Sequence, residues 1–228
     1  MPASSRMLTR PVTAVLVVAA VVAAIASTLL AVAHARQPSA QPVVAFMGDS
    51  YTAGSREDDG FASRYPALIA KDLDIEPAVS AEPGAGYVRP GVVGVPFADE
   101  VAAVPVHADV VVIYGSRNDP FDGSVAAAVG QAASELIAAV EERAPDAAVV
   151  VIGPSYVEHP IPVGGVQNAA AIRSACAAAG VRYVDALDWL QHPDPGVIGS
   201  DGVHPTALGH RDLAKRIGPV VAEALQER

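Results

Sequence analysis

The stretch that decides the fold is Val43-Val44-Ala45-Phe46-Met47-Gly48-Asp49-Ser50. Its first five residues form a short apolar run that ends at Gly48, which predicts a buried β-strand. Glycine has no Cβ, so the chain can turn sharply at that position. Ser50 then stands at the carboxyl end of a strand and just before a helix, where open α/β sheets bind their ligands. A serine hydroxyl at this place needs a base and an oxyanion site to act as a nucleophile.

A second motif, Asp201-Gly202-Val203-His204-Pro205, lies far downstream. His204 can supply the base, and Asp201 can supply the carboxylate that orients it. Gly202 permits the tight loop that is needed if both side chains are to point into one cleft. Because the two motifs stand at the two ends of one domain, they indicate nucleophilic catalysis by Ser50.

The chain between these motifs alternates between short apolar runs and stretches with helical periodicity. The predicted order is β-α-β-β-α-β-α-β-α, with an irregular stretch before the third strand. This alternation is typical of an α/β protein with a mostly parallel sheet and helices on both faces, a three-layer α/β/α fold. Ser124 is the expected N-cap of the second helix, and Pro205 suits the first turn of the last one. The predicted strands span residues 43–47, 77–81, 109–114, 147–152 and 181–184, and the predicted helices span residues 61–73, 125–143, 165–179 and 205–225.

Several residues with useful chemistry lie in the loops that follow predicted strands. In chain order they are Ser50, Gly84, Gly86, Asn118, Asp201 and His204. The carboxyl ends of parallel strands meet at one edge of a sheet, so a nucleophile, a base and several hydrogen-bond donors gather there. Tyr51 and Arg117 flank this place and are candidates for contact with the substrate.

These residues resemble the sequence blocks of the SGNH hydrolases, the GDSL esterase and lipase superfamily, from about Val43 to Leu225. The first block matches Gly48-Asp49-Ser50, and the resemblance implies that Ser50 is the nucleophile. The last block, Asp-x-x-His, matches Asp201 and His204. The resemblance implies that these two residues complete a catalytic triad with Ser50.

The same resemblance implies an oxyanion hole. The Ser50 N–H, a glycine N–H and the Asn118 side chain would form it, with Gly84 the better match and Gly86 the alternate. Two positions depart from the family pattern. Tyr51 replaces a frequent leucine, and Ser116 stands where the third block usually has glycine.

The fold that the resemblance implies is flavodoxin-like, with five parallel strands in the order 2-1-3-4-5, the SGNH hydrolase fold. The reaction that it implies is acyl transfer to water through an acyl-enzyme, without a cofactor. The α/β-hydrolase alternative fails because the chain holds no Gly-x-Ser-x-Gly motif.

The composition excludes several classes of protein. Of 228 residues, 51% are hydrophobic, so the chain is not disordered. After residue 36 the chain holds 12 basic and 25 acidic residues, and this net charge of −13 would repel nucleic acid. No His/Asp/Glu cluster has the spacing of metal ligands, so we expect no metal. We expect a monomer.

Residues 1–36 predict a targeting segment. Arg6 and Arg10 precede an uncharged run, Val12 to Val32, that is long enough to span a bilayer as a helix with its N-terminus inside. Small-x-small patterns at Ala31-Val32-Ala33 and Ala33-His34-Ala35 fit cleavage. The segment is therefore either a signal peptide or an uncleaved signal anchor, which would contact the membrane through residues 12–32.

The predicted organisation places a linker at residues 37–41 and the hydrolase domain at residues 42–228. We expect the domain to be secreted or anchored on the outer side of the cytoplasmic membrane. There it would act as a serine esterase or lipase-like hydrolase on an acyl lipid, an acylated sugar or a small ester. The alternatives are a cell-envelope glycan acyltransferase or deacetylase, and a non-catalytic envelope-binding domain. The intact set of Ser50, Asn118, Asp201 and His204 argues against the last.

Overall fold

Five short strands pair into one parallel sheet in the computed structural model, which describes residues 41–191 and 193–227. The strand order is β2-β1-β3-β4-β5, so the predicted topology is confirmed. Every residue of β1 and β3 is buried, as expected for central parallel strands covered on both faces. The strands are β1 (Val43–Gly48), β2 (Glu76–Ala81), β3 (Val110–Tyr114), β4 (Ala148–Ile152) and β5 (Arg182–Val184).

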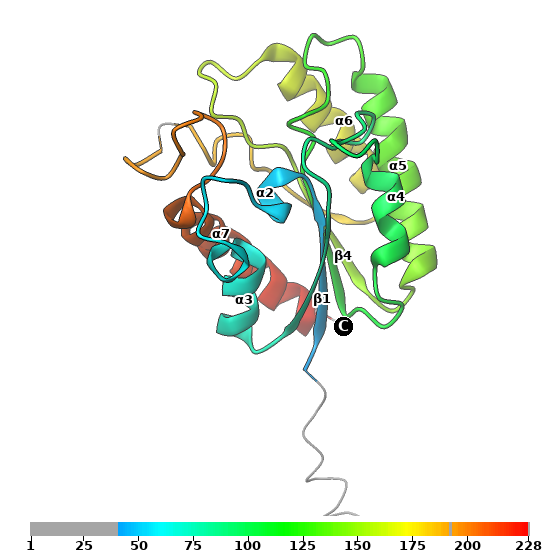
Figure 1. The fold of residues 1–228 in the computed structure, drawn as a ribbon. Helices are drawn as coiled ribbons and strands as arrows, with labels where there is room; N and C mark the ends of the chain where they lie inside the picture. The colour runs from blue at the N-terminus through cyan, green and yellow to red at the C-terminus, as the bar shows by residue number, and fades with distance from the viewer. Residues whose placement is uncertain (1–40, 192, 228) are drawn as a thin grey trace, which may run out of the picture. The chain divides into compact units, whose positions relative to one another are not determined.

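Helices cover both faces of this sheet. Figure 1 shows α3 and α7 on one face and α4, α5 and α6 on the other. Side chains alternate along β1, so Phe46 packs with the α3 and α7 layer while Met47 packs with the α5 and α6 layer. The α-helices are α2 (Ser50–Ala53), α3 (Tyr65–Leu73), α4 (Phe97–Glu100), α5 (Ala126–Arg143), α6 (Val163–Ala179) and α7 (Ala207–Gln226), and the 3₁₀ helices are η1 (Phe61–Ser63) and η2 (Val101–Ala103).

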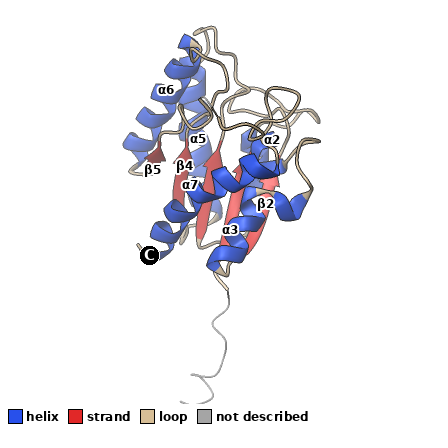
Figure 2. Ribbon diagram, turned by 90° about the vertical axis from the view of Figure 1, so that its left-hand side faces the viewer, coloured by secondary structure: helices blue, strands red, loops and turns tan. Residues whose placement is uncertain are grey.

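The carboxyl ends of the strands lie at one edge, and most of the long loops gather beyond that edge (Figure 2). The register places Gly48 of β1 beside Ala81 of β2 and Tyr114 of β3. The loops after these three strands therefore start at adjacent points. This arrangement brings the candidate site residues from distant parts of the sequence together.

The prediction that Ser124 caps α5 is wrong. The helix begins at Ala126, and Val125 is its N-cap residue without a side-chain hydrogen bond. The Ser124 hydroxyl instead donates to Asp122 Oδ1 at 2.6 Å. The Ser124 N–H donates to the same oxygen at 2.9 Å, so Asp122 holds both groups of this serine in the loop before the helix.

The prediction that Pro205 lies in the first turn of α7 is also wrong. Pro205 pairs with Ile198 in an isolated antiparallel bridge before the helix. Thr206 is the N-cap, because its Oγ1 accepts the N–H groups of Leu208 and Gly209 at 3.1 and 3.3 Å.

The predicted targeting segment, residues 1–36, and most of the predicted linker lie outside the described residues. Within residues 41–191 and 193–227, none of the helices combines the length and the apolar character needed to cross a bilayer.

Candidate catalytic site

The turn after β1 presents Ser50 at the start of α2. Asp49 is the N-cap of that helix, and its Oδ1 accepts the Tyr51 N–H at 2.9 Å. Gly48 is required by close packing, since an added Cβ would lie 2.4 Å from the Tyr114 carbonyl oxygen. The chain can therefore bring Ser50 directly against the end of β3 only with glycine at position 48.

Ser50, His204 and Asp201 form one chain of contacts. His204 Nε2 lies 3.0 Å from Ser50 Oγ, and His204 Nδ1 lies 2.6 Å from Asp201 Oδ2. The other carboxylate oxygen accepts the backbone N–H groups of Val203 and His204 at 2.8 and 2.9 Å. Gly202, at φ +70°, makes the left-handed turn that allows this wrap. The geometry is that of a nucleophile, a base and an orienting acid.

Hydrogen bonding determines whether Asp201 is ionised and which nitrogen of neutral His204 carries the proton. Partial burial raises the pKa of Asp201, but the backbone and imidazole N–H groups of His204, with the Val203 N–H, outweigh it and lower the pKa to about 2. Asp201 is therefore ionised at neutral pH and can only accept a hydrogen bond. Neutral His204 must then carry its proton on Nδ1, which leaves Nε2 as an acceptor facing Ser50 Oγ.

Tyr51 packs against the loop that carries Val203 and His204. Its side chain is buried, and its hydroxyl donates to the Val203 carbonyl at 2.9 Å. The Tyr51 and His204 rings lie edge to face with centroids 6.2 Å apart. Arg117, the other predicted substrate contact, forms an ion pair with Glu158 at 2.6 Å.

The candidate oxyanion donors differ in their present partners. The Gly86 N–H already donates to the Arg89 carbonyl at 2.9 Å. Within the described part of the chain, neither the Gly84 N–H nor the Ser50 N–H donates a hydrogen bond. Asn118 Nδ2 donates to Asp49 Oδ2 at 3.1 Å and to the Ala85 carbonyl at 2.9 Å.

Asp119 holds the loop that contains Gly86. Its buried carboxylate accepts the N–H groups of Tyr87, Val88 and Arg89 at 3.0, 2.9 and 3.1 Å. A Cβ on Gly86 would lie 2.5 Å from Asp119 Oδ1, so glycine leaves room for the carboxylate. Gly86 therefore contributes to the site by leaving space for the Asp119 side chain.

The structure shows how a serine is accommodated at position 116, where the family pattern usually has glycine. It adopts φ +95°, a left-handed conformation in which glycine is the favoured residue. Its hydroxyl donates to Asp119 Oδ2 at 2.8 Å, and this buried contact to a carboxylate offsets the backbone strain.

A buried pair behind the cleft was not expected. His210 is 1% exposed, and its Nε2 lies 3.7 Å from Asp58 Oδ2. Burial lowers the pKa of His210 to about 4, although Asp58 opposes this shift. Arg64 binds both Asp58 and the Ala53 carbonyl, which connects this pair to the end of α2.

An open cleft of about 750 Å³ lies beside Ser50 and His204. Most of the side chains around it are polar or charged. The other lining residues are Gly54, Ser55, Arg56, Glu57, Arg64, Pro83, Val92 and Asp201.

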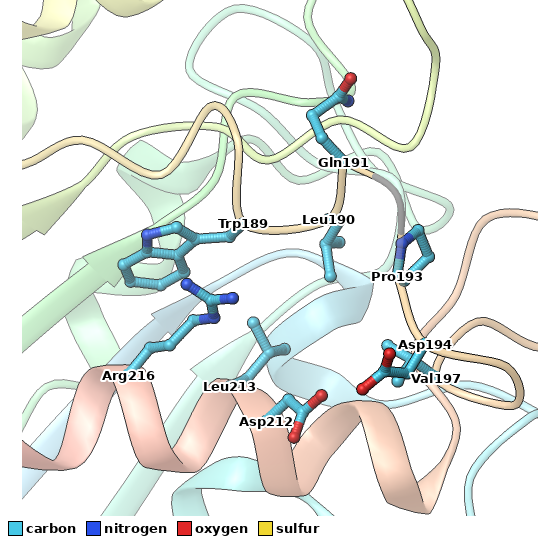
Figure 3. Close-up of a pocket in the computed structure, with 9 residues that line it drawn as sticks. All are labelled: Trp189, Leu190, Gln191, Pro193, Asp194, Val197, Asp212, Leu213 and Arg216. Carbon is cyan, nitrogen blue, oxygen red and sulfur yellow. The ribbon is translucent and has the colours of Figure 1, made fainter.

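A second cavity, of about 150 Å³, lies between α7 and the loop before it (Figure 3). The Arg216 guanidinium lies 5.8 Å from the centre of the Trp189 ring, and Asp212 and Asp194 face the same space. This cavity is not lined by Ser50, His204 or Asp201. Over residues 41–191 and 193–227, no group of three or more His, Cys, Asp or Glu side chains is placed to hold a metal ion.

A parallel sheet in this order, with a serine, a histidine and an aspartate in contact at its carboxyl edge, defines an SGNH-type hydrolase. The chain belongs to the GDSL-like lipase/acylhydrolase family, whose model matches residues 46–211. It is accordingly an ester-hydrolysing enzyme of the serine hydrolase class, and the predicted family is confirmed.

Relatives agree with this assignment. The GDSL lipase Rv0518 of Mycobacterium tuberculosis is 34% identical over 191 residues, covering 80% of this chain and 82% of the relative. A family two carbohydrate esterase from Cellvibrio japonicus has a TM-score of 0.66 at 17% identity, over 83% of this chain and 63% of that chain. Est24, a carbohydrate acetylesterase from Sinorhizobium meliloti, has a TM-score of 0.64 at 17% identity, over 80% of this chain and 99% of that chain. At these identities the two structures are similar to this chain in fold.

Proposed function

We propose that this enzyme cleaves carboxylic esters through an acyl-enzyme on Ser50, with His204 as the base and Asp201 as its orienting carboxylate. The observation that carries the proposal is the continuous contact from Ser50 Oγ to His204 Nε2, 3.0 Å, and from His204 Nδ1 to Asp201, 2.6 Å. His204 takes the hydroxyl proton while Oγ bonds to the ester carbon, and it then protonates the leaving alcohol. Water then attacks the acyl-enzyme with His204 again as the base, and the carboxylic acid and free Ser50 are released.

The negative oxygen of the tetrahedral intermediate needs donors, and we assign the Ser50 N–H, the Gly84 N–H and Asn118 Nδ2. Gly84 is favoured over Gly86 because the Gly86 N–H is occupied by Arg89. Both Asn118 protons have partners, and the contact with Asp49, 3.1 Å, is the longer of the two. The oxyanion replaces that contact, since its charge develops only during the reaction.

The test is covalent labelling and turnover of the full chain. A fluorophosphonate should label the wild type and not Ser50→Ala, and His204→Ala should lose nearly all labelling. Asn118→Ala should lower kcat by about 10²–10³-fold, the usual effect of one oxyanion donor. Ser55→Ala is the control, since Ser55 lines the same cleft and its hydroxyl accepts the Glu57 N–H at 3.1 Å. Wild-type turnover in Ser50→Ala would overturn the mechanism.

Arg56, Glu57 and Arg64 line the cleft and could hydrogen-bond the hydroxyl groups of a hydrophilic alcohol, such as the sugar of an acylated glycan. The carbohydrate esterases of the same fold support this choice, and the similarity to a GDSL lipase supports the lipid alternative. A panel of acetylated glycans and nitrophenyl esters of rising chain length distinguishes the two. Product analysis with a sugar acceptor distinguishes hydrolysis from acyl transfer between glycans.

We also propose export, from Arg6 and Arg10 ahead of the apolar run of residues 12–32. Cell fractionation with a C-terminal tag should find the domain outside the cytoplasm or on the membrane. The mass of the mature N-terminus then distinguishes a cleaved signal peptide from an anchor. A soluble, full-length protein confined to the cytoplasm would contradict export.

A further inference from the structure

Glu100 is an acidic residue buried under the catalytic edge of the sheet. It is the last residue of α4, in the stretch that the sequence left irregular, and it is 5% exposed. Its Oε2 accepts the Gly48 N–H and its Oε1 accepts the Glu82 N–H, both at 3.1 Å. The Glu82 N–H is shared, because it also donates to the Gly48 carbonyl at 3.0 Å. One carboxyl group thus joins the ends of β1 and β2.

The two amides that Glu100 binds lie at equal distances along the chain from two proposed oxyanion donors. Gly48 is two residues before Ser50, and Glu82 is two residues before Gly84. Each intervening turn is short, so a shift of either bonded amide moves the donor that follows it. An oxyanion donor works only within a narrow range of distances, about 2.7–3.1 Å from the oxygen.

We infer that Glu100 is a positioning residue that sets the separation of the Ser50 and Gly84 N–H groups in the oxyanion hole. The inference rests on the proposed function, and it adds a residue that none of the family blocks contains. Glu100 acts through the backbone and does not touch the substrate.

Two other buried carboxylates join the remaining pairs of loops. Before the oxyanion forms, Asp49, after β1, accepts from Asn118, after β3. Asp119, after β3, accepts from Tyr87 and its neighbours in the loop after β2. Each pair of the three oxyanion loops therefore shares one carboxyl group, and Glu100 is the member supplied by a separate helix. Without it, the loops after β1 and β2 would keep backbone contacts but lose this bridge.

Burial of an ionisable group such as Glu100 is electrostatically unfavourable, which argues against a merely structural role. Burial raises its pKa to about 8, the nearby carboxyls of Asp49 and Glu82 act in the same direction, and the two N–H groups oppose them. Isolating an acid from water costs stability unless the group has partners. The two backbone donors are the compensation, and both belong to the site.

The test compares kcat and KM of the full chain in Glu100→Gln and Glu100→Ala. Glutamine keeps one acceptor but turns an N–H₂ group toward the second amide, so both variants lose the bridge while Gln keeps the side-chain volume. We expect kcat to fall at least tenfold in both, with KM changed by less than twofold, because binding of the ground state does not use the oxyanion donors. Ser80→Ala is the matched control, since Ser80 Oγ donates to the Glu100 backbone carbonyl at 2.9 Å and leaves the carboxylate intact.

Active-site titration by the acyl-enzyme burst separates positioning from damage to the fold. A lower kcat per titrated site supports the inference. A smaller burst with an unchanged kcat per site, or an equal loss in Ser80→Ala, would overturn it. Ser50→Ala is assayed beside these variants. If Ser50→Ala is inactive while both Glu100 variants keep wild-type kcat, the positioning role fails alone, whereas activity in Ser50→Ala would remove the proposed function itself.

Discussion

Removal of the Asp119 carboxylate should be among the most destabilising single changes in the loops around the site. In the wild type this group accepts four hydrogen bonds, from the N–H groups of Tyr87, Val88 and Arg89 and from the Ser116 hydroxyl. Asp119→Ala leaves all four donors without that acceptor. Water can reach the amides of Val88 and Arg89, which are only partly buried.

The magnitude follows from the other two donors. The Tyr87 N–H and the Ser116 hydroxyl make buried hydrogen bonds. A buried donor left without a partner costs about 1–3 kcal/mol, so two of them cost about 2–6 kcal/mol. A domain of this kind has a total stability of about 5–15 kcal/mol, so the loss would be a large fraction of it.

Equilibrium unfolding in urea measures this loss through the midpoint and the slope of the transition. Asp119→Asn should lose less than Asp119→Ala, because one acceptor oxygen remains. Asp122→Ala is the control, an exposed carboxylate in the same loop that bonds Ser124, and it should stay within about 0.5 kcal/mol of the wild type. If Asp119→Ala unfolds within 1 kcal/mol of the wild type, or no earlier than Asp122→Ala, the reasoning is refuted.

Gly86→Ala should cost about 1–3 kcal/mol, since its Cβ would lie 2.5 Å from Asp119 Oδ1. In a double-mutant cycle most of that cost should disappear in the Asp119→Ala background, and additive costs would contradict the contact. His210 has a native pKa of about 4 against 6.5 when unfolded, so the unfolded chain binds more protons between these values. Stability should therefore decline as pH falls from 6.5 to 4, and unfolding curves of His210→Gln should lack that component. An equal decline in both proteins would assign it elsewhere.

The parts of the fold that could be predicted from sequence are those that local patterns determine. The Val-rich run of β3 and the apolar run before Gly48 are brief, buried and bounded by turn residues, so their strand character is visible without tertiary information. The carboxyl-edge rule then places Ser50, Asn118 and His204 together, because every parallel strand ends at the same edge.

What could not be predicted depends on contacts between distant residues. Glu100 bonds Gly48 across 52 positions, and His210 meets Asp58 from another part of the chain. Neither acid lies in a recognisable motif, and their roles exist only once the loops have packed. The errors at Ser124 and Pro205 have a different origin. Ser124 is held before the helix by a local hydrogen bond to Asp122, whereas Pro205 pairs with Ile198 and leaves the cap to Thr206.

The direction of β1 has a practical consequence for attaching this enzyme to other material. Val43 begins β1 (Figure 1) and Ser50 follows its far end, so the chain enters the sheet at the edge opposite the one where Ser50 lies. Six residues of strand at about 3.3 Å each separate the two edges by roughly 20 Å. Coupling the enzyme at Gln41 to a resin, a sensor surface or a fusion partner would therefore leave the Ser50 site facing away from the attachment point. Immobilisation through that end should preserve turnover of bulky esters better than coupling through side chains near the cleft.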